Sequence, residues 1–285
     1  MKYLIIGKKG QLGKAFVKEL TGQGREISAF DIDELDIGNL SDVLSVFEQL
    51  KPSVVINCAA YNHVDLAEEH FTLAYRVNGL AVKNLAFASK KYNAFLVHYG
   101  SDYIFDGEKS DGLYAEDDQV RPLNEYGKSK YLGEFLLKEE TERYLIFRLS
   151  WVFGEGEQNF IYKLLKWSEQ NKYLNIACDE VSVPTYTNTI VPVTLKALSH
   201  ELTGTYHLTN SGYASRYEWA RFIMKTLKID KFIYPVSRES FNLPARRPAF
   251  SAMSNEKISG KLDLVIPSWE DSVENFIRNY YRNAL

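Results

Sequence analysis

Tyr126 and Lys130 stand four positions apart in a segment that we predict to be a helix, with Asn124 as its N-cap and Leu137 near its end. Residues at i and i+4 share one helix face, so the phenol and the ammonium can reach one ligand. A free tyrosine has a pKa of about 10, and we expect the neighbouring lysine cation to lower it toward the working range. The pair is typical of acid–base catalysis by a phenol, and the same ammonium is placed to hold the ribose of a nicotinamide cofactor.

Ser101 adds a hydroxyl at the point where a predicted strand ends, just before Asp102. Ligands of parallel sheets bind outside the carboxyl ends of the strands. We therefore expect Ser101 to hold a substrate carbonyl beside Tyr126. Ser101, Tyr126 and Lys130 are the predicted catalytic residues.

Glycines recur at three-residue spacing directly after the first predicted strand and at the start of the first predicted helix. Glycine allows a tight turn, a close backbone approach to a pyrophosphate and close packing of helix on strand. The helix N-terminus then presents free N–H groups to the phosphates. The predicted dinucleotide-binding residues of this turn are Gly7, Gly10, Gln11, Leu12 and Gly13.

Asp31 ends the second predicted strand, where a carboxylate meets the hydroxyls of the adenosine ribose. Its charge would repel a 2′-phosphate and so favours NADH, while Lys8 or Lys9 would offset that repulsion. The cofactor is therefore predicted to be NADH or NADPH. Asp36 and Ile37 are expected to flank the adenine, although an ordinary loop before a helix explains them equally well.

The elements that must position these residues alternate along the first half of the chain. Short apolar runs predict buried strands, and segments with a 3.6-residue period predict helices between them. The strands are Tyr3–Ile6, Glu26–Phe30, Val54–Asn57, Phe95–Tyr99 and Leu145–Leu149; the helices are Gln11–Leu20, Ser41–Leu50 with Ser41 as N-cap, and Leu73–Lys90. This alternation predicts an α/β fold, a Rossmann-type doubly wound parallel sheet with helices on both faces.

The second half is less regular and carries no linker, which favours a smaller C-terminal substrate domain interleaved with the first. Helices are predicted at Phe160–Asn171, Asn188–His200, Tyr217–Leu227 and Trp269–Tyr281, and strands at Thr205–Leu208 and Phe232–Val236. We assign residues 1–152 plus 182–209 to an NAD(P)-binding domain. Residues 153–181 plus 210–285 are assigned to a sugar-nucleotide-binding domain, on the resemblance given below.

Composition narrows the classes of protein. The 285 residues include 34 Lys and Arg against 37 Asp and Glu, a net charge of −3, so nucleic acid is not an expected partner. No apolar stretch reaches the length of a membrane span, and the N-terminal apolar run is too short for a signal peptide. Cys58 and Cys178 form neither a disulfide framework nor a zinc spacing, which favours the cytoplasm, and no metal site is expected.

Several further motifs give the chain a family resemblance. Together with the residues above, it resembles the extended short-chain dehydrogenases/reductases, and within them the dTDP-4-dehydrorhamnose reductases, over nearly its whole length. The resemblance is specific as a combination rather than in any single motif. The motifs are 57–61 (Asn-Cys-Ala-Ala-Tyr), 64–68, Val77-Asn78, 101–105 (Ser-Asp-Tyr-Ile-Phe), 148–154 (Arg-Leu-Ser-Trp-Val-Phe-Gly), Asn159-Phe160, Pro184-Thr185 and 245–251 (Ala-Arg-Arg-Pro-x-x-Ser).

The resemblance implies an NAD(P)H-dependent reduction at carbon 4 of a deoxysugar nucleotide. Tyr126 would give a proton to the oxygen while hydride is delivered to the carbon, Ser101 would polarise the carbonyl, and Lys130 would tune Tyr126. Further residues enter only through the resemblance: Ala59, Ala60, Tyr61 and Asn78 toward the cofactor, Asp102, Tyr103, Trp151 and Asn159 toward the sugar nucleotide, and Arg246 and Arg247 toward its diphosphate. The partner is then a sugar nucleotide, and a homodimer is left open.

Departures from the family pattern bear on the alternatives. Gly100 and Ser101 replace the usual Ser-Thr, and we expect Gly100 to loosen the strand end; Asn62 and His63 also depart from the family. Tyr103 stands where related 4,6-dehydratases carry a glutamate base, which disfavours dehydration. Two alternatives stay open: a sugar-nucleotide epimerase, and a non-catalytic NAD(P)-binding subunit resembling the regulatory subunit of methionine adenosyltransferase.

Overall fold

A six-stranded parallel sheet in the order β10-β5-β4-β3-β1-β2 forms the centre of the protein. The computed structural model describes residues 1–281. The strands are β1 (Lys2–Ile6), β2 (Glu26–Phe30), β3 (Val54–Asn57), β4 (Phe95–Ser101), β5 (Tyr144–Leu149) and β10 (Gly204–His207). The strand order reverses direction at β1 and β3, so the carboxyl ends of these two strands flank the crevice where such sheets bind ligands. The predicted Rossmann-type fold and its strands are confirmed.

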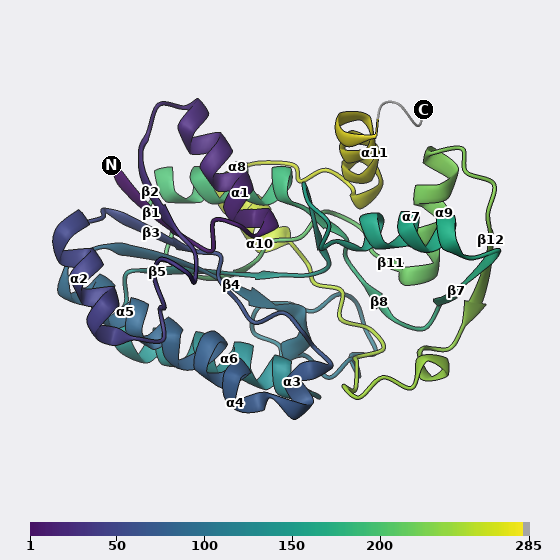
Figure 1. Cartoon of the computed structure of the whole chain (residues 1–285), viewed down its shortest axis with the longest axis horizontal. Helices are drawn as coiled ribbons and strands as arrows, with labels where there is room; N and C mark the ends of the chain where they lie inside the picture. Colours follow the sequence, from purple (N-terminus) through teal and green to yellow (C-terminus); the bar gives the residue numbers. More distant parts are fainter. Residues whose placement is uncertain (282–285) are drawn as a thin grey trace.

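Helices cover both faces of the sheet (Figure 1). Side chains on alternate strand positions enter separate cores, with Ile5 and Ile56 on one side and Leu4 and Val55 on the other. Both faces of the sheet are therefore shielded from water. This explains why the strands are continuous runs of apolar residues and do not alternate between apolar and polar residues. One face carries α1 (Gln11–Gly22), α8 (Thr187–Ser199) and α10 (Glu256–Leu262); the other carries α2 (Leu40–Leu50), α5 (Ala81–Lys91) and α6 (Glu125–Glu140).

A C-terminal lobe with an aromatic core lies beside the carboxyl end of the sheet (Figure 1). Phe153, Trp219 and Phe276 are fully buried in that core. Its elements are β6 (Val152–Phe153), α7 (Phe160–Gln170), β7 (Tyr173–Ala177), β8 (Val181–Ser182), β9 (Thr185–Tyr186), β11 (Ala214–Ser215), α9 (Arg216–Thr226), β12 (Phe232–Val236), the 3₁₀ turn η3 (Arg238–Phe241) and α11 (Trp269–Tyr280). The predicted helices and the strand Phe232–Val236 of this half are present.

The assigned domain boundaries remain a prediction. The core packing shows one segment of the second assigned domain that packs with the first lobe. Ile258, Leu262 and Ile266 belong to the core on the α1 side of the sheet. Residues 258–266 therefore pack with the first lobe, although their sequence position groups them with the second. The cause is the return of the chain to the sheet at α10, a step that no local pattern encodes.

The predicted helix Leu73–Lys90 is wrong in its continuity. A short α3 (Leu66–Glu69) is followed by α4 (Phe71–Tyr75), a π-helical turn η1 (Arg76–Leu80) and then α5. The wider turn contains Asn78, whose carbonyl would lie 2.1 Å from a Cβ at Gly133 of α6. Single π-helical turns within α-helices occur frequently at functional sites, and this one contains Asn78.

The predicted N-cap of α2 is also wrong by two positions. Asn39 is the cap, and its side-chain oxygen accepts a hydrogen bond from the Ser41 backbone N–H at 3.1 Å. Asparagine and serine are comparably good caps, so residue type alone did not distinguish them. The predicted cap Asn124 of α6 is confirmed, since its side chain accepts from the Gly127 N–H at 2.8 Å.

The start of α1 is held against the end of β1 by two glycines. Gly7 has φ +83°, a conformation that L side chains rarely adopt. A Cβ at Gly13 would lie 2.0 Å from the Gly7 carbonyl oxygen. The helix can therefore approach the strand this closely only because residue 13 has no side chain.

Gly13→Ala is expected to destabilise the protein by about 1–3 kcal/mol, because the added methyl must push the helix off the strand. Gly22→Ala is the matched control, since nothing lies within 4 Å of a Cβ at the far end of the same helix. The control is expected to change the unfolding free energy by less than about 0.5 kcal/mol. Urea unfolding of both variants measures the difference, and equal losses would contradict the close-contact argument.

Candidate active site

Helix α6 delivers Tyr126 and Lys130 to the carboxyl end of β4, where Ser101 lies. The helix comes close because Gly127 has no side chain: a Cβ there would lie 2.2 Å from the Tyr103 carbonyl oxygen. Tyr103 belongs to η2 (Asp102–Ile104), the turn that follows β4. The three predicted catalytic residues are thus brought to one edge of the sheet by sequence-distant elements.

Lys130 is buried and bonded to the strand behind the site. Its Nζ donates a hydrogen bond to the Tyr99 carbonyl oxygen at 2.6 Å, and the residue is 3% exposed. Burial lowers the pKa of Lys130 to about 8, opposed by the charge of Glu134 one turn along α6. Lys130 can therefore change its protonation state near neutral pH.

Tyr126 presents its phenol to the cleft. Its ring packs edge-on against Tyr103 at 5.8 Å between centroids, and its hydroxyl lies 3.5 Å from the Asn62 side-chain oxygen. Burial raises the pKa of Tyr126 to about 12, a hydrogen bond with Ser101 lowers it, and the charge of Asp102 raises it. The expected lowering by Lys130 is wrong for this structure, because burial dominates and the ammonium is bonded to Tyr99.

Ser101 and Asp102 form a buried pair at the strand end. The Ser101 hydroxyl donates to Asp102 Oδ1 and accepts the Tyr103 N–H, both at 3.2 Å. The expected loosening of the strand at Gly100 is wrong: a Cβ there would lie 2.2 Å from Glu134 Oε1. Gly100 instead makes room for a carboxylate that is paired with Arg148 at 3.0 Å in the protein interior.

The glycine turn fits a dinucleotide. A Cβ at Gly7 would lie 2.8 Å from the Ala59 nitrogen, so the first turn and the loop after β3 form one cradle with no room for a side chain. Gln11 adds a buried side-chain oxygen with no hydrogen-bond partner, a group left for a ligand to satisfy. NAD(P)H would be held here by backbone N–H groups at the start of α1, and it would supply hydride. Leu12 is largely buried in the core, so it contributes through its backbone.

Acidic and basic side chains surround the predicted ribose position. Asp31 accepts hydrogen bonds from the backbone N–H of Lys9 at 2.8 Å and of Ile32 at 2.9 Å. Lys8 pairs with Glu34 at 2.6 Å, and Lys9 pairs with Asp33 at 2.7 Å. These exposed pairs are weak, so each ammonium can exchange its partner for another anion.

Of the two residues expected to flank the adenine, Asp36 is at the surface and Ile37 is in the core. Asp36 is paired with Arg76 of η1 and also accepts the Gly38 N–H at 2.8 Å. Ile37 is 4% exposed and packs in the core on the α2 side. The Ile37 side chain thus does not face an adenine, and its carbonyl accepts a hydrogen bond from the Asn84 side chain at 3.0 Å, while Asp36 lies at the surface.

Asn78 orders the loop that follows β3. Its side-chain oxygen accepts the Tyr61 N–H at 2.8 Å, and its nitrogen donates to the Tyr61 carbonyl and to Ser129 Oγ, each at 3.0 Å. Ala59 is fixed as well, donating its N–H to Asn57 at 3.1 Å. The loop bearing Ala59, Ala60 and Tyr61 is therefore tied to both η1 and α6.

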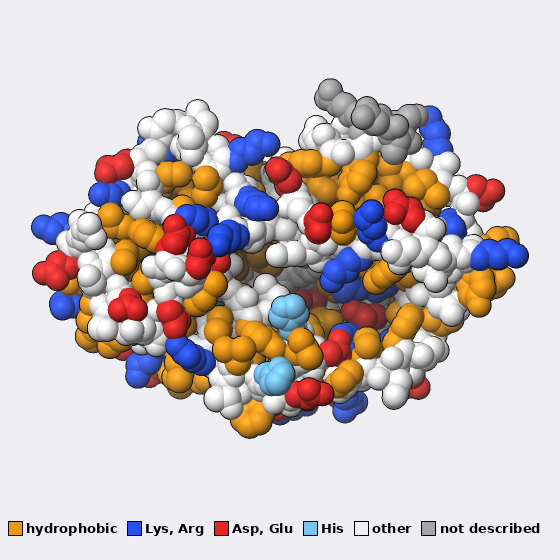
Figure 2. All heavy atoms as spheres, viewed as in Figure 1, with side chains coloured by type: hydrophobic (Ala, Val, Ile, Leu, Met, Phe, Trp, Pro, Cys, Tyr) orange, Lys and Arg blue, Asp and Glu red, His pale blue; other side chains and the backbone are white. Residues whose placement is uncertain are grey.

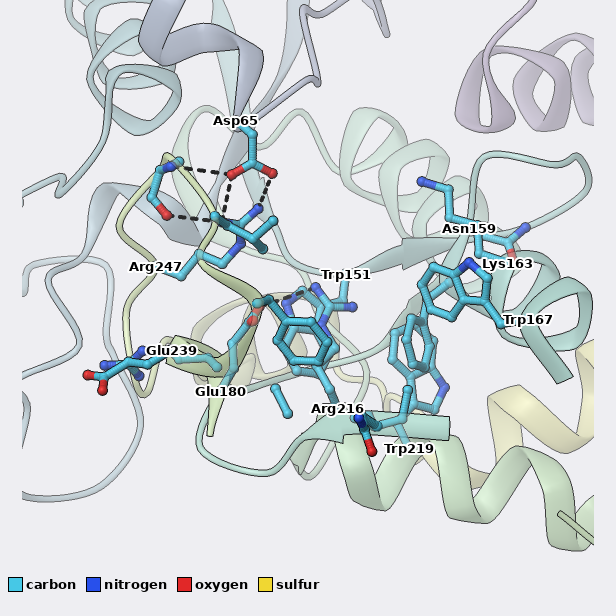
Figure 3. A pocket seen from close by; sticks show the side chains of 18 of the residues that line it. Asp65, Trp151, Asn159, Lys163, Trp167, Glu180, Arg216, Trp219, Glu239 and Arg247 are labelled. Atoms are coloured by element: carbon cyan, nitrogen blue, oxygen red, sulfur yellow. Dashed lines mark hydrogen bonds and ion pairs between the residues drawn. The ribbon is translucent and has the colours of Figure 1, made fainter. Parts of the chain in front are cut away.

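A pocket of about 820 Å³ lies in the C-terminal lobe, and its lining includes Trp151 and Val152, just after β5 (Figure 3). Figure 2 shows the molecule hollowed between its two lobes, with basic side chains along the hollow. The guanidinium of Arg216 lies 3.5 Å from the Trp151 ring centroid, and Trp151 stacks on Trp219 at 5.7 Å. Phe160, Trp167 and Lys163 also line the pocket. An aromatic wall with cations at its rim suits a nucleotide base and phosphates.

Sequence reasoning missed several of these residues. Arg216, Lys163, Trp219 and Glu180 line the pocket, and Glu180 pairs with Arg216 at 3.4 Å. They come from helices α7 and α9 and from the residue before β8, and no local motif marks them. The signal in the sequence was the aromatic content of the two amphipathic helices. Aromatic residues in such helices are explained equally well by burial in a core, so this signal did not indicate a pocket.

The arginines and the asparagine inferred from the resemblance line the same pocket. Arg247 is held by Asp65 through two hydrogen bonds of 2.6 and 2.9 Å, and this pairing keeps the pKa of Asp65 low despite partial burial. Arg246 is exposed beside it. Asn159 caps α7 by accepting the Tyr162 N–H at 2.9 Å and donates to two carbonyls, so its side chain is already engaged.

Comparisons with known proteins agree with this geometry. The model of the RmlD substrate binding domain matches residues 1–282. The chain belongs to the RmlD family. A dTDP-4-dehydrorhamnose reductase of Aggregatibacter actinomycetemcomitans is 36% identical over 292 residues, covering 98% of this chain and 99% of its own.

Solved structures of RmlD-like proteins give the same result. A dTDP-4-dehydrorhamnose reductase from Clostridium acetobutylicum ATCC 824 superposes with a TM-score of 0.95 at 36% identity, covering 99% of this chain and 100% of that one. The Bacillus anthracis str. Ames reductase, solved in complex with NADP, gives 0.94 at 35% identity over 98% and 99% of the two chains. The predicted family is therefore confirmed.

Across residues 1–281, none of the helices has the length and apolar character needed to cross a membrane. In the same residues no group of three or more His, Cys, Asp or Glu is arranged to hold a metal ion. Cys58 and Cys178 are free thiols, and burial raises the pKa of Cys58.

Lys130→Met is expected to change how stability depends on pH. The folded pKa of Lys130 is about 8 against 10.5 for the free side chain, so folding is disfavoured while the buried ammonium is charged. The native protein should therefore gain roughly 1–3 kcal/mol from this group as pH rises from 8 toward 10.5, and the variant should lack that gain. Urea unfolding at three pH values in this window measures the slope of each protein, and identical slopes would contradict the assignment.

Proposed function

We propose that the protein reduces the 4-keto group of a dTDP-4-keto-6-deoxysugar with NAD(P)H, converting dTDP-4-dehydro-L-rhamnose to dTDP-L-rhamnose. The observation that carries the proposal is the convergence of Ser101, Tyr126 and Lys130 at the carboxyl edge of the sheet, the edge that also carries the glycine cradle after β1 and, after β5, the pocket residue Trp151. The names of its 36%-identical relatives support the same reaction. The protein is thus an NAD(P)H-dependent oxidoreductase.

Tyr126, Ser101 and Lys130 have different roles in the reduction. Reduction requires a neutral acid beside the ketone oxygen, and the raised pKa of about 12 keeps the Tyr126 phenol protonated at neutral pH. The alkoxide that forms at carbon 4 is a stronger base than a phenolate, so the proton moves from Tyr126 to oxygen. Ser101 donates a hydrogen bond to the same oxygen, and Lys130, bonded to the Tyr99 carbonyl, holds the ribose of the nicotinamide cofactor.

The cofactor end accepts either dinucleotide on this proposal. Asp31 is placed for the ribose hydroxyls of NADH, and the exchangeable ammonium groups of Lys8 and Lys9 are placed for the 2′-phosphate of NADPH. Gly7, Gly10, Gln11, Leu12 and Gly13 hold the pyrophosphate. Asp36, Ile37, Ala59, Ala60, Tyr61 and Asn78 complete the cofactor side.

The sugar-nucleotide end is the pocket. Trp151 is proposed to stack on the base, with Arg216 on its other face, and Arg247 with Arg246 to meet the diphosphate. The Tyr103 hydroxyl donates to Glu180, which lines this pocket, at 3.4 Å, and Asp102 precedes Tyr103 at the end of β4. Asn159 acts by holding the start of α7, since all its polar atoms are engaged there.

We also propose that the protein works in the cytoplasm and forms a homodimer. Two free thiols support a reducing compartment. For the dimer, the support is an exposed apolar face on α4, η1, α5 and α6 that a second copy would cover; its residues are Leu73, Leu80, Phe87, Tyr131 and Phe135. Light scattering on the purified protein reports the mass, and a monomer at high concentration would contradict the dimer.

Tyr126→Phe is expected to lower kcat by about a thousandfold, because the variant has no proton to give. The dissociation constant of NADPH should change by less than about threefold, since the aromatic ring remains. Tyr131→Phe on the same helix is the control, since Tyr131 is 37% exposed and also loses only a hydroxyl. Consumption of NADPH with freshly prepared dTDP-4-keto-6-deoxysugar measures kcat, and a near-normal rate in the Tyr126 variant would refute the proposal.

Arg247→Met is expected to raise KM for the sugar nucleotide by about tenfold or more, because one charge-assisted contact to phosphate is lost. Binding of NADPH should not change, since Arg247 lies in the other half of the cleft. Asp65→Asn frees the same guanidinium and keeps its charge, so its KM should stay within about threefold of the native value. Equal increases in both variants would mean that the ion pair, and not the diphosphate, accounts for the effect.

A further inference from the structure

A buried carboxylate joins the catalytic strand to the C-terminal lobe. Asp102 is 3% exposed and accepts hydrogen bonds from three serine hydroxyls. Ser182 and Ser251 donate to Oδ2 at 2.8 and 2.6 Å, and Ser101 donates to Oδ1 at 3.2 Å. Two of these donors come from parts of the chain far from the catalytic strand.

The two distant serines are fixed by backbone pairing within the C-terminal lobe. Ser182 lies in β8 and pairs with Ala214 of β11. The Ser251 N–H donates to the Val181 carbonyl at 2.9 Å, which joins the segment around residue 250 to the same strand. The serines are also fully buried, so the position of Asp102 Oδ2 is set by the lobe and not by solvent.

This arrangement determines how the Ser101 hydroxyl is directed. Its oxygen accepts the Tyr103 N–H, and its hydrogen points to Asp102 Oδ1, each at 3.2 Å. A hydroxyl rotates freely unless its partners hold it. With both partners in place, the Ser101 oxygen is held in one orientation, and its interaction with Tyr126 lowers the pKa of that phenol.

Stability alone does not account for a charge at this position. Taking a carboxylate out of water is costly, and an apolar contact would join the lobes at lower cost. Burial raises the pKa of Asp102 to about 6; hydrogen bonds from Ser251, Ser182 and Ser101, and then the charge of Arg216, oppose the rise. Tyr103 and Tyr126 are the other titratable groups whose pKa values respond to Asp102.

We propose that Asp102 is a positioning residue, anchored by Ser182 and Ser251, whose carboxylate holds the Ser101 oxygen in the place from which its hydroxyl donates a hydrogen bond to the substrate oxygen. The expected contact of Asp102 with the sugar is then secondary, because three of the carboxylate's acceptor positions are already taken. The inference rests on the role proposed above for Ser101. When a ketone oxygen lies beside Tyr126, the Ser101 hydroxyl hydrogen turns from Asp102 Oδ1 to that oxygen, while the Ser101 oxygen stays in place.

The test compares kcat, KM for the sugar nucleotide and the unfolding free energy in Asp102→Asn, Ser182→Ala and Ser251→Ala. Ser150→Ala is the matched control: Ser150 is 2% exposed and its hydroxyl donates to the Val183 carbonyl at 2.7 Å, next to Ser182 but not to Asp102. We expect kcat to fall about tenfold in the three variants with KM within about threefold, and kcat of the control to stay within about twofold.

Asp102→Asn separates positioning from structure. Because the folded pKa lies above the ordinary 3.8, the stability linked to Asp102 is full below that value and is lost as pH rises through about 6. At pH 8 the asparagine variant should therefore be at least as stable as the native protein while its kcat is lower. A kcat that follows stability in all four variants, Ser150→Ala included, would overturn the proposal.

Ser101→Ala distinguishes failure of the role proposed for Ser101 from failure of the positioning role proposed for Asp102. A normal kcat in this variant would remove the role proposed for Ser101, and this inference with it. A large loss of kcat in Ser101→Ala, together with native kcat values in the Asp102, Ser182 and Ser251 variants, would overturn the positioning role alone.

Discussion

The active edge depends on the close approach of helix α6 to the end of β4 and to the turn η1. Three glycines permit it, since a Cβ at Gly100, Gly127 or Gly133 would lie between 2.1 and 2.2 Å from an atom of the neighbouring element. At this distance the lysine reaches a backbone carbonyl of the strand, and the tyrosine reaches the serine at its end. Backbone shape thus sets the geometry before any charge acts.

The same close packing sets the protonation states. Burial lowers the pKa of Lys130 and raises those of Tyr126 and Asp102, so each group is moved toward its neutral form. A neutral phenol is the form that a reductase needs, because it must give a proton as hydride arrives. The other half of the cleft has the opposite character: cations and aromatic rings suited to an anionic nucleotide.

The sequence was sufficient for features with a local or periodic signal. The strands, the glycine turn after β1, the cap Asn124 and the spacing of Tyr126 and Lys130 were all predictable, because each depends on a few neighbouring residues. The π-helical turn at Asn78 and the tight strand end at Gly100 were not predictable, because both depend on contacts with α6. Arg216 and the serines that hold Asp102 were missed for the same reason: their partners lie many residues away.

The protonation of the Tyr126 phenol tests the account most directly. Carbon-13 NMR of ring-labelled tyrosine, with the Tyr126→Phe spectrum used to assign the resonance, follows that phenol through a pH titration. Burial beside Tyr103 of η2 predicts a midpoint above the ordinary 10.0, near 12. A midpoint below 10.0 would show that the neighbouring ammonium, and not burial, controls the phenol, and would contradict the account.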